Sequence, residues 1–152
     1  RRAAEHKGTA FVEIFQNCIV FNDGAYDAIT DKSLRDDARL LLEHGKPLIY
    51  GKGRDKGVRL RGLEPEAVAL GESGVSEADL VVHDEAAEHG GLAFFLSQFD
   101  APALPVPLGV FRAVSAPTYE DMNLQLHADA EARKGRGTLA GLFNSGDTWT
   151  IK

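Results

Sequence analysis

Hydrophobic and polar residues follow one another along the chain in short blocks that predict a mixed α/β protein. Residues 1–7 have the pattern of the last two turns of a helix, and Gly8 stands where a left-handed residue commonly ends one. The run from Thr9 to Phe15 is rich in β-branched and aromatic residues, which predicts a strand buried on both faces of a parallel sheet. A helix followed by such a strand is half of a βαβ unit.

A second helix is predicted to begin at Thr30 or Asp31, which are suitable capping residues, and to end at Gly45 and Pro47. The apolar residues of this segment recur at helical spacing: Leu34, Ala38, Leu41 and Leu42. The pattern therefore favours one continuous helix here.

Two apolar runs, at residues 48–50 and 58–61, flank a charged segment with three glycines, Gly51 to Gly57. This arrangement predicts a β-hairpin with an exposed loop at its tip. Residues 68–70 add a third short strand.

Farther along, residues 80–84 predict a short buried strand that ends in the polar pair His83-Asp84, and residues 92–99 predict an apolar helix. A proline-rich approach then leads to a predicted strand at residues 108–114. Seven apolar residues are predicted to lie in the core: Val12, Ile14, Leu41, Leu42, Phe94, Phe95 and Phe111.

The last part of the chain predicts two helices and a strand. Thr118 and Asp121 have the spacing of a capping box, so a helix should begin there and run to about Arg133. A glycine-rich break separates it from a short helix at residues 139–143, and residues 147–151 predict a final strand.

Composition excludes several classes of function. The chain has 152 residues and a formal net charge of -6, which disfavours a nucleic-acid interface. No run reaches the roughly 20 apolar residues of a membrane helix, and no secretion signal is recognisable. A single cysteine fits the reducing cytoplasm, where we expect the protein to reside. A helix that begins at residue 1 without a cap or an initiator methionine predicts that the chain is cut from a longer protein.

The single cysteine is the strongest candidate for chemistry. Cys18 follows an apolar run and precedes Asn22-Asp23-Gly24, a sequence typical of a turn. A thiolate is a strong ligand for the iron of a 4Fe-4S cluster, which needs four such ligands. From the spacing alone, an ordinary buried thiol is the favoured interpretation. A nucleophilic cysteine would need a base, and nothing in the sequence pairs a histidine with Cys18.

Two other motifs have a structural interpretation as well as a chemical one. His83-Asp84 has the composition of a catalytic histidine–carboxylate couple, but such pairs occur more often in capped turns. The segment from Gly51 to Gly57 lacks both the Walker order and the Gly-x-Gly-x-x-Gly order of phosphate loops, so a mobile hairpin tip is favoured.

Three separated motifs, in the same order, resemble those of one enzyme family. They are the Gln16-Asn17-Cys18 loop, the Pro105 to Arg112 strand with Pro117 to Glu120 after it, and the Ser145 to Thr150 tail. Together they resemble the C-terminal half of the β subunit of 2-oxoacid:ferredoxin oxidoreductases, most closely the 2-oxoglutarate ferredoxin oxidoreductase type. The resemblance covers nearly the whole chain.

The resemblance implies an α/β fold. Residues 1–30 would form the C-terminal helix and strand of a thiamine diphosphate-binding domain, including the cysteine loop, and residues 31–152 a mixed α+β C-terminal extension. Cys18 would be the fourth ligand of a 4Fe-4S cluster whose other cysteines lie in the N-terminal half of the subunit. The Gly-Asp-Gly motif that holds Mg²⁺ and thiamine diphosphate is absent from this chain. No residue here is therefore expected to be catalytic or to bind that cofactor.

For the parent enzyme, the resemblance implies oxidative decarboxylation of a 2-oxoacid, 2-oxoglutarate being favoured, to an acyl-CoA, with electrons passing through the cluster to ferredoxin. The implied partners are an α subunit of the same heterooligomer, ferredoxin, the 2-oxoacid and coenzyme A; nucleic acid and membrane are not among them. This chain alone should be inactive. The alternative interpretation is a non-catalytic module that docks to another subunit.

Overall fold

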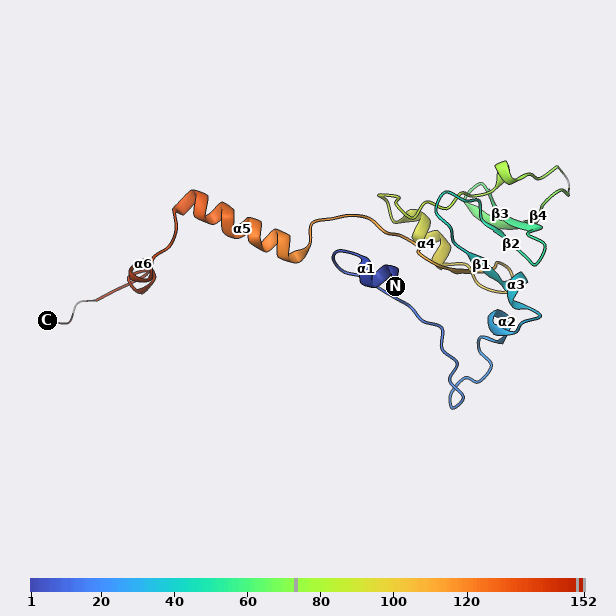
Figure 1. The fold of residues 1–152 in the computed structure, drawn as a ribbon, viewed down its shortest axis with the longest axis horizontal. Coiled ribbons are helices and arrows are strands. Elements are labelled where there is room, and N and C mark those ends of the chain that lie inside the picture. Colours follow the sequence, from blue (N-terminus) through green and yellow to red (C-terminus); the bar gives the residue numbers. More distant parts are fainter. Residues whose placement is uncertain (73, 150, 152) are drawn as a thin grey trace. The chain divides into compact units, whose positions relative to one another are not determined.

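The computed structural model describes residues 1–72, 74–149 and 151. The chain divides into two compact units. One unit comprises Arg1–Val12 and Ser115–Lys152, and the other comprises Glu13–Val114 (Figure 1). The domain boundary predicted at residue 30 refers to the parent subunit and does not coincide with these units. It stays a prediction.

Within the described residues, the larger unit contains two small sheets. In the first, β1 (Arg39–Leu41) pairs in parallel with β5 (Val106–Leu108). In the second, β2 (Ile49–Tyr50), β3 (Lys56–Arg61) and β4 (Glu64–Ala69) form an antiparallel sheet in that order. The predicted mixed α/β fold is confirmed at this level, and so are the hairpin and its third strand. The predicted exposed loop from Gly51 to Gly57 is wrong at its end, because Lys56 and Gly57 belong to β3 and Gly57 is buried.

The predicted helix that begins at Thr30 or Asp31 and ends at Gly45 and Pro47 is wrong. Two single turns, α2 (Asp27–Thr30) and α3 (Arg35–Ala38), precede β1 instead. Leu40 of β1 is fully buried opposite Pro107, and the Leu42 N–H donates to the Leu108 carbonyl at 2.9 Å. Pairing with a strand far along the chain thus overrides the local helical spacing.

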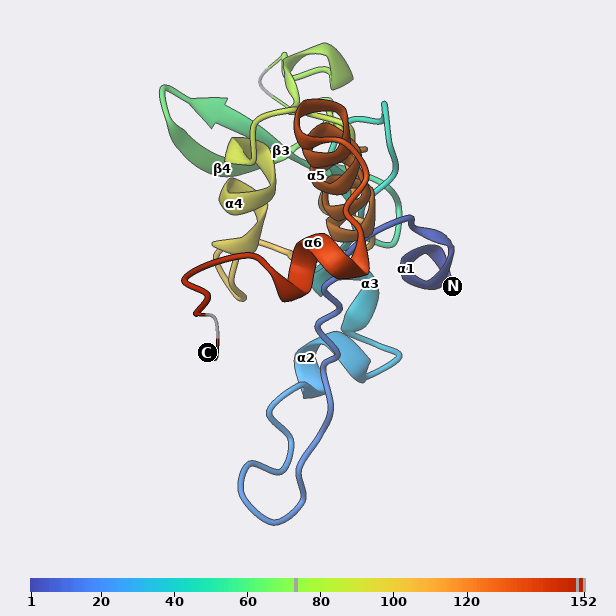
Figure 2. The same ribbon diagram turned by 90° about the vertical axis from the view of Figure 1, so that its left-hand side faces the viewer.

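The core of the larger unit lies between the sheets and α4 (Gly91–Ser97), the predicted apolar helix (Figure 2). Its buried members come from β1, from β3 and the residue before β2, and from α4 and the residues just after it: Leu40, Leu48, Val58, Leu96 and Phe99. Phe95 packs against this cluster and meets Phe99 edge to face, with ring centroids 5.0 Å apart. Such a pair adds to the stabilisation from area burial alone.

Three of the seven predicted core residues pack against this core: Leu42, Phe95 and Phe111. The other four are exposed, and the prediction is wrong for them: Val12, Ile14, Leu41 and Phe94. Leu41 is exposed because it follows the buried Leu40 in a strand, where successive side chains point to opposite faces. Phe94 lies on the outer side of α4, two residues before the buried Leu96.

The predicted buried strand from Thr9 to Phe15 is also wrong for this chain. These residues form no strand, and the side chains of Phe11 and Ile14 are 89% and 78% exposed. A strand that is buried on both faces needs neighbouring strands, and none of the described segments pairs with this one.

Residues 80–84 form two isolated bridges instead of the predicted strand. Leu80 pairs with Arg59, and Val82 pairs with Pro47. Gly57 is required beside this segment, because a Cβ at that position would lie 2.5 Å from a methyl carbon of Leu80. The predicted strand at residues 108–114 begins earlier, as β5, and ends at Leu108.

A short 3₁₀ helix, η1 (Glu77–Asp79), precedes these bridges. The smaller unit contains α1 (Arg2–Glu5), α5 (Tyr119–Lys134) and α6 (Leu139–Phe143). Both predicted C-terminal helices are therefore confirmed. Residues 147–149 and 151 of the predicted final strand are not in a strand, and Thr150 lies outside the described residues. None of the described helices is long and apolar enough to cross a membrane.

The capping box of α5 is confirmed in detail. The Asp121 N–H donates to the Thr118 hydroxyl at 3.1 Å, and the Thr118 N–H donates to the Asp121 carboxylate at 3.2 Å. The Lys7 ammonium donates to the same carboxylate at 3.0 Å. Gly135, with φ of +74°, follows the last turn, and a glycine adopts this positive φ without steric cost.

Acid should weaken this cap. The Lys7 ammonium, followed by the Thr118 N–H and hydroxyl, lowers the pKa of Asp121. Because the folded pKa is depressed, the stabilisation is present above the ordinary aspartate pKa and is lost as pH falls through the lowered value. We expect a carboxyl NMR titration of Asp121 to show this lowered midpoint and Lys7→Gln to raise it. An unchanged midpoint in Lys7→Gln would contradict the contact.

Candidate functional site

Cys18 lies in an exposed loop of the larger unit, between Glu13 and α2. In Figures 1 and 2 this segment extends away from the two sheets. The Asn22 N–H donates to the Cys18 carbonyl at 2.9 Å, and the two residues form an isolated antiparallel bridge. The thiol residue therefore begins a tight turn of five residues.

Asn17, the residue before the cysteine, stabilises the loop through two hydrogen bonds of its side chain. Its side-chain amide donates to the Asp23 carboxylate at 2.8 Å, and its side-chain carbonyl accepts the Gly24 N–H at 3.0 Å. Gly24 has φ of +77°, and a Cβ there would lie 2.9 Å from a carboxylate oxygen of Asp27. The predicted Asn-Asp-Gly turn is therefore present, and its glycine is required by both conformation and space.

The backbone of the turn affects the acidity of the Cys18 thiol. Hydrogen bonds from the N–H groups of Phe21, Val20 and Asn22, in that order of importance, lower the pKa of the Cys18 thiol. Lowering the pKa raises the thiolate fraction at neutral pH, and the thiolate is the form that binds metal or acts as a nucleophile. The alternative prediction of a buried structural thiol is wrong, because Cys18 is exposed.

We expect Cys18 to react with iodoacetamide at a lower pH than an unstructured cysteine does. The chain has one cysteine, so the alkylation rate reports this thiol alone. The same chain in urea is the control, because unfolding removes the three N–H donors. Coincident pH–rate profiles in the two conditions would contradict the hydrogen-bonded thiolate.

The loop can supply one metal ligand. Among the residues that the structure describes, no three histidine, cysteine, aspartate or glutamate side chains come together to hold a metal ion. An exposed thiol with backbone donors to sulfur fits one corner of an iron–sulfur site, where such hydrogen bonds tune the cluster. Because the chain has one cysteine, a complete four-thiolate cluster site would need thiolates from outside this chain.

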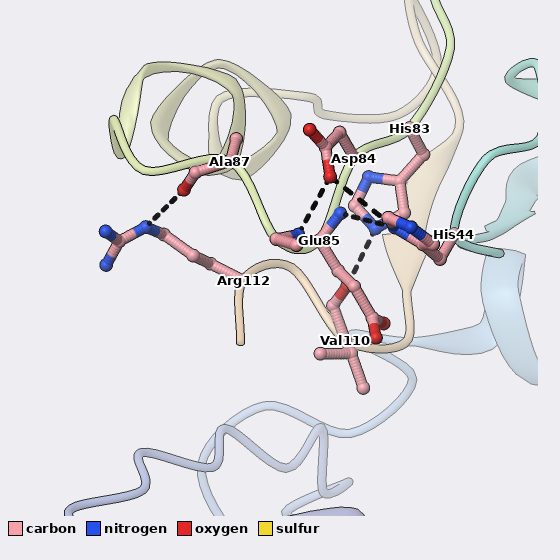
Figure 3. A network of polar contacts seen from close by, with 8 residues as sticks. His44, His83, Asp84, Glu85, Ala87, Val110 and Arg112 are labelled. Carbon is pink, nitrogen blue, oxygen red and sulfur yellow. Dashed lines mark hydrogen bonds and ion pairs between the residues drawn. The ribbon is translucent and has the colours of Figure 1, made fainter. Parts of the chain in front are cut away.

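His83 and Asp84 do not form the couple that their sequence suggests. His83 is fully buried, and its Nε2 lies 2.8 Å from the Val110 carbonyl (Figure 3). Asp84 instead faces His44, with 3.5 Å between its carboxylate and His44 Nδ1. The Glu85 N–H also contacts that nitrogen, at 3.2 Å. His83 thus joins the bridge segment to the chain after β5, which is a structural role.

Arg112 extends the same network, and no sequence motif indicates its role. Its guanidinium donates to the Ala87 carbonyl at 3.1 Å and to the Glu88 carbonyl at 2.5 Å. The Ala113 N–H donates to the Glu85 carbonyl at 2.6 Å. These contacts fix the loop before α4, and they require a pairing between segments that are distant in the sequence.

Comparison with known proteins identifies a relative. No protein-family model matches the chain, and no solved structure matches it. The chain is 34% identical over 154 residues to the 2-oxoglutarate oxidoreductase subunit KorB of Mycobacterium tuberculosis (strain ATCC 25618 / H37Rv). The match covers 99% of this chain, which spans 40% of the length of that relative. The predicted resemblance is thereby confirmed: over nearly its whole length, the chain is similar to a 2-oxoglutarate oxidoreductase subunit.

Proposed function

We propose that this chain is part of the β subunit of a 2-oxoglutarate:ferredoxin oxidoreductase and that Cys18 is one thiolate ligand of its 4Fe-4S cluster. The similarity to KorB across 99% of the chain is the observation that carries the proposal. The exposed, hydrogen-bonded thiol supports the ligand assignment. Residues 1–30 would belong to the end of the thiamine diphosphate-binding domain, and residues 31–152 to the extension that follows it.

The cluster would supply one-electron transfer when bound. This chain would present the Cys18 sulfur, hold the loop in shape through Asn17 and lower the pKa of the thiol through the backbone donors of residues 20–22. Thiamine diphosphate and Mg²⁺ would be held by residues outside this chain. The α subunit, ferredoxin, 2-oxoglutarate and coenzyme A would be partners of the whole enzyme.

The assembled enzyme tests this proposal. The intact protein should be purified with its partner subunit and supplied with thiamine diphosphate, Mg²⁺, coenzyme A and ferredoxin. We expect 2-oxoglutarate to drive coenzyme A-dependent reduction of ferredoxin, at a rate at least tenfold above that with pyruvate. Equal rates would reject the preference for 2-oxoglutarate, and no reduction with any 2-oxoacid would reject the oxidoreductase.

The exposed apolar residues around the cysteine favour a docking module as the second candidate. Ile19 and Phe21 are 78% and 90% exposed, which suits a surface that another chain covers. A pure docking module would bind the partner subunit without iron and without activity. Iron analysis of the purified complex therefore separates the two candidates.

A further inference from the structure

A partly open cavity of about 430 Å³ lies within the larger unit, away from the cysteine loop. Segments that are distant in sequence build its walls: the α3–β1 junction on one side, β2 and the start of the hairpin loop on the other. Its polar lining carries four cationic side chains, Arg35, Arg39, Lys52 and Arg54, but only two carboxylates, Asp36 and Glu43. The cavity is therefore locally positive in a chain whose net charge is -6.

The carboxylates near the cavity neutralise only part of this charge. Arg35 Nε lies 3.6 Å from the Asp36 carboxylate. Asp37, just behind the wall, is engaged by the Lys56 ammonium at 2.7 Å. Asp55 is also close to this wall. One of its carboxylate oxygens would lie 2.6 Å from a Cβ placed on Gly51. Counting these neighbours with the lining still leaves an excess of cations.

Backbone geometry holds the hairpin loop against the cavity. The Gly51 N–H donates to the Asp36 carbonyl at 3.0 Å, which ties the loop to α3. The Arg54 N–H donates to the Gly51 carbonyl at 2.9 Å, closing a turn. Arg54 has φ of +52°, a left-handed conformation that is uncommon for a residue with a side chain. The loop that the sequence predicts as a mobile tip is thus anchored at its base.

Buried and half-buried groups complete the lining. Arg39 is half-buried, and its Nε donates to the Ile29 carbonyl, which fixes the guanidinium plane. Burial raises the pKa of Tyr50, whose hydroxyl therefore stays protonated and able to donate a hydrogen bond. Guanidinium groups, an ammonium and a hydroxyl are donors, and they suit a ligand that is rich in anionic oxygens.

We propose that this cavity binds a small molecule carrying a phosphoryl or diphosphate group. Its volume lies within the range of small-molecule sites, and a cleft with an excess of one sign of charge attracts ligands of the other sign. Arginine binds phosphate oxygens in pairs, and lysine adds a compact charge. The loop lacks the order of known phosphate loops, so side chains, not a cradle of backbone N–H groups, supply the contacts. The site is independent of the proposed oxidoreductase activity.

Calorimetric titration of the intact protein with inorganic pyrophosphate tests the site. A diphosphate site held by residues outside this chain would be the same in the wild type and in the variants, so the difference between them reports this cavity alone. We expect saturable binding that weakens at least tenfold in the double variant Lys52→Gln, Arg54→Asn, because two charged contacts are lost. Both side chains are exposed, and asparagine tolerates the left-handed backbone, so the variant should fold. Arg61→Gln, at the exposed end of β3 and outside the lining, is the matched control and should bind as the wild type does.

Amide hydrogen exchange locates the binding. Pyrophosphate should slow exchange at residues 51–54 in the wild type and in Arg61→Gln, but not in the double variant. Absence of saturable binding, equal affinity in the double variant, or protection confined to other residues would overturn the proposal. Citrate serves as a carboxylate probe of similar charge, and citrate binding as tight as that of pyrophosphate would overturn the assignment to phosphate.

Discussion

Replacing Cys18 with serine in the assembled enzyme is expected to remove about four iron atoms per copy of this chain, because the cluster loses a ligand. A serine hydroxyl is a harder ligand and is far less acidic than the thiol, so it is a poor substitute for a thiolate. The backbone N–H groups that lower the pKa of the thiol would remain, but they would face a neutral oxygen. Ferredoxin reduction should fall steeply with the iron.

Ala25→Ser is the matched control for this substitution. Ala25 is exposed in the same loop, and the change introduces the same side chain without removing a sulfur. Iron content and the paramagnetic resonance spectrum of the reduced protein should be unaltered in this variant. Thiamine diphosphate binding should survive in both variants, since it would use other ligands. An unchanged iron count and spectrum in Cys18→Ser would remove Cys18 from the cluster.

The features that can be predicted correctly from the sequence are specified by neighbouring residues. The β2–β3 hairpin follows from two apolar runs around glycines, and the start of α5 follows from Thr118 and Asp121, three residues apart. The cysteine loop is equally local, because Asn17 reaches only to Asp23 and Gly24. Signals of this kind can be read from one segment at a time.

The features that differ from the prediction depend on distant partners. Arg39 to Leu41 has helical spacing but forms β1, because β5 lies alongside it 67 residues later, Arg39 opposite Val106. His83 finds the Val110 carbonyl and not a catalytic partner. The cationic cavity gathers arginines from the α3–β1 junction and from the hairpin loop, and neither segment has a binding motif of its own.

The donors to the cysteine sulfur could not be read from sequence for a different reason. Every residue except proline has a backbone N–H, so residues 20–22 carry no special signal. The turn conformation alone directs these groups to the thiol. A sequence pattern can thus propose Cys18 as a ligand, but the electrostatic setting of the sulfur is a property of the fold.

Two apolar residues of α4 that lie two positions apart, Phe94 and Leu96, test which face of the helix packs on the core. Leu96 is fully buried, whereas the side chain of Phe94 is 70% exposed. Leu96→Ala should lower the free energy of unfolding by about 2–5 kcal/mol, because it removes buried methyl groups and leaves a cavity. Phe94→Ala should change it by less than about 0.5 kcal/mol, although phenylalanine is the larger side chain.

Amide exchange at Val58 in the intact protein measures this difference. The Val58 N–H donates to the Leu48 carbonyl at 3.0 Å, so its exchange requires opening of the core that Leu96 fills. The expected loss in Leu96→Ala corresponds to an exchange rate roughly thirtyfold to several thousandfold faster, whereas Phe94→Ala should differ from the wild type by about twofold. Similar acceleration in both variants would mean that α4 presents a different face to the core. The antiparallel sheet would then be held by contacts other than those of Leu96.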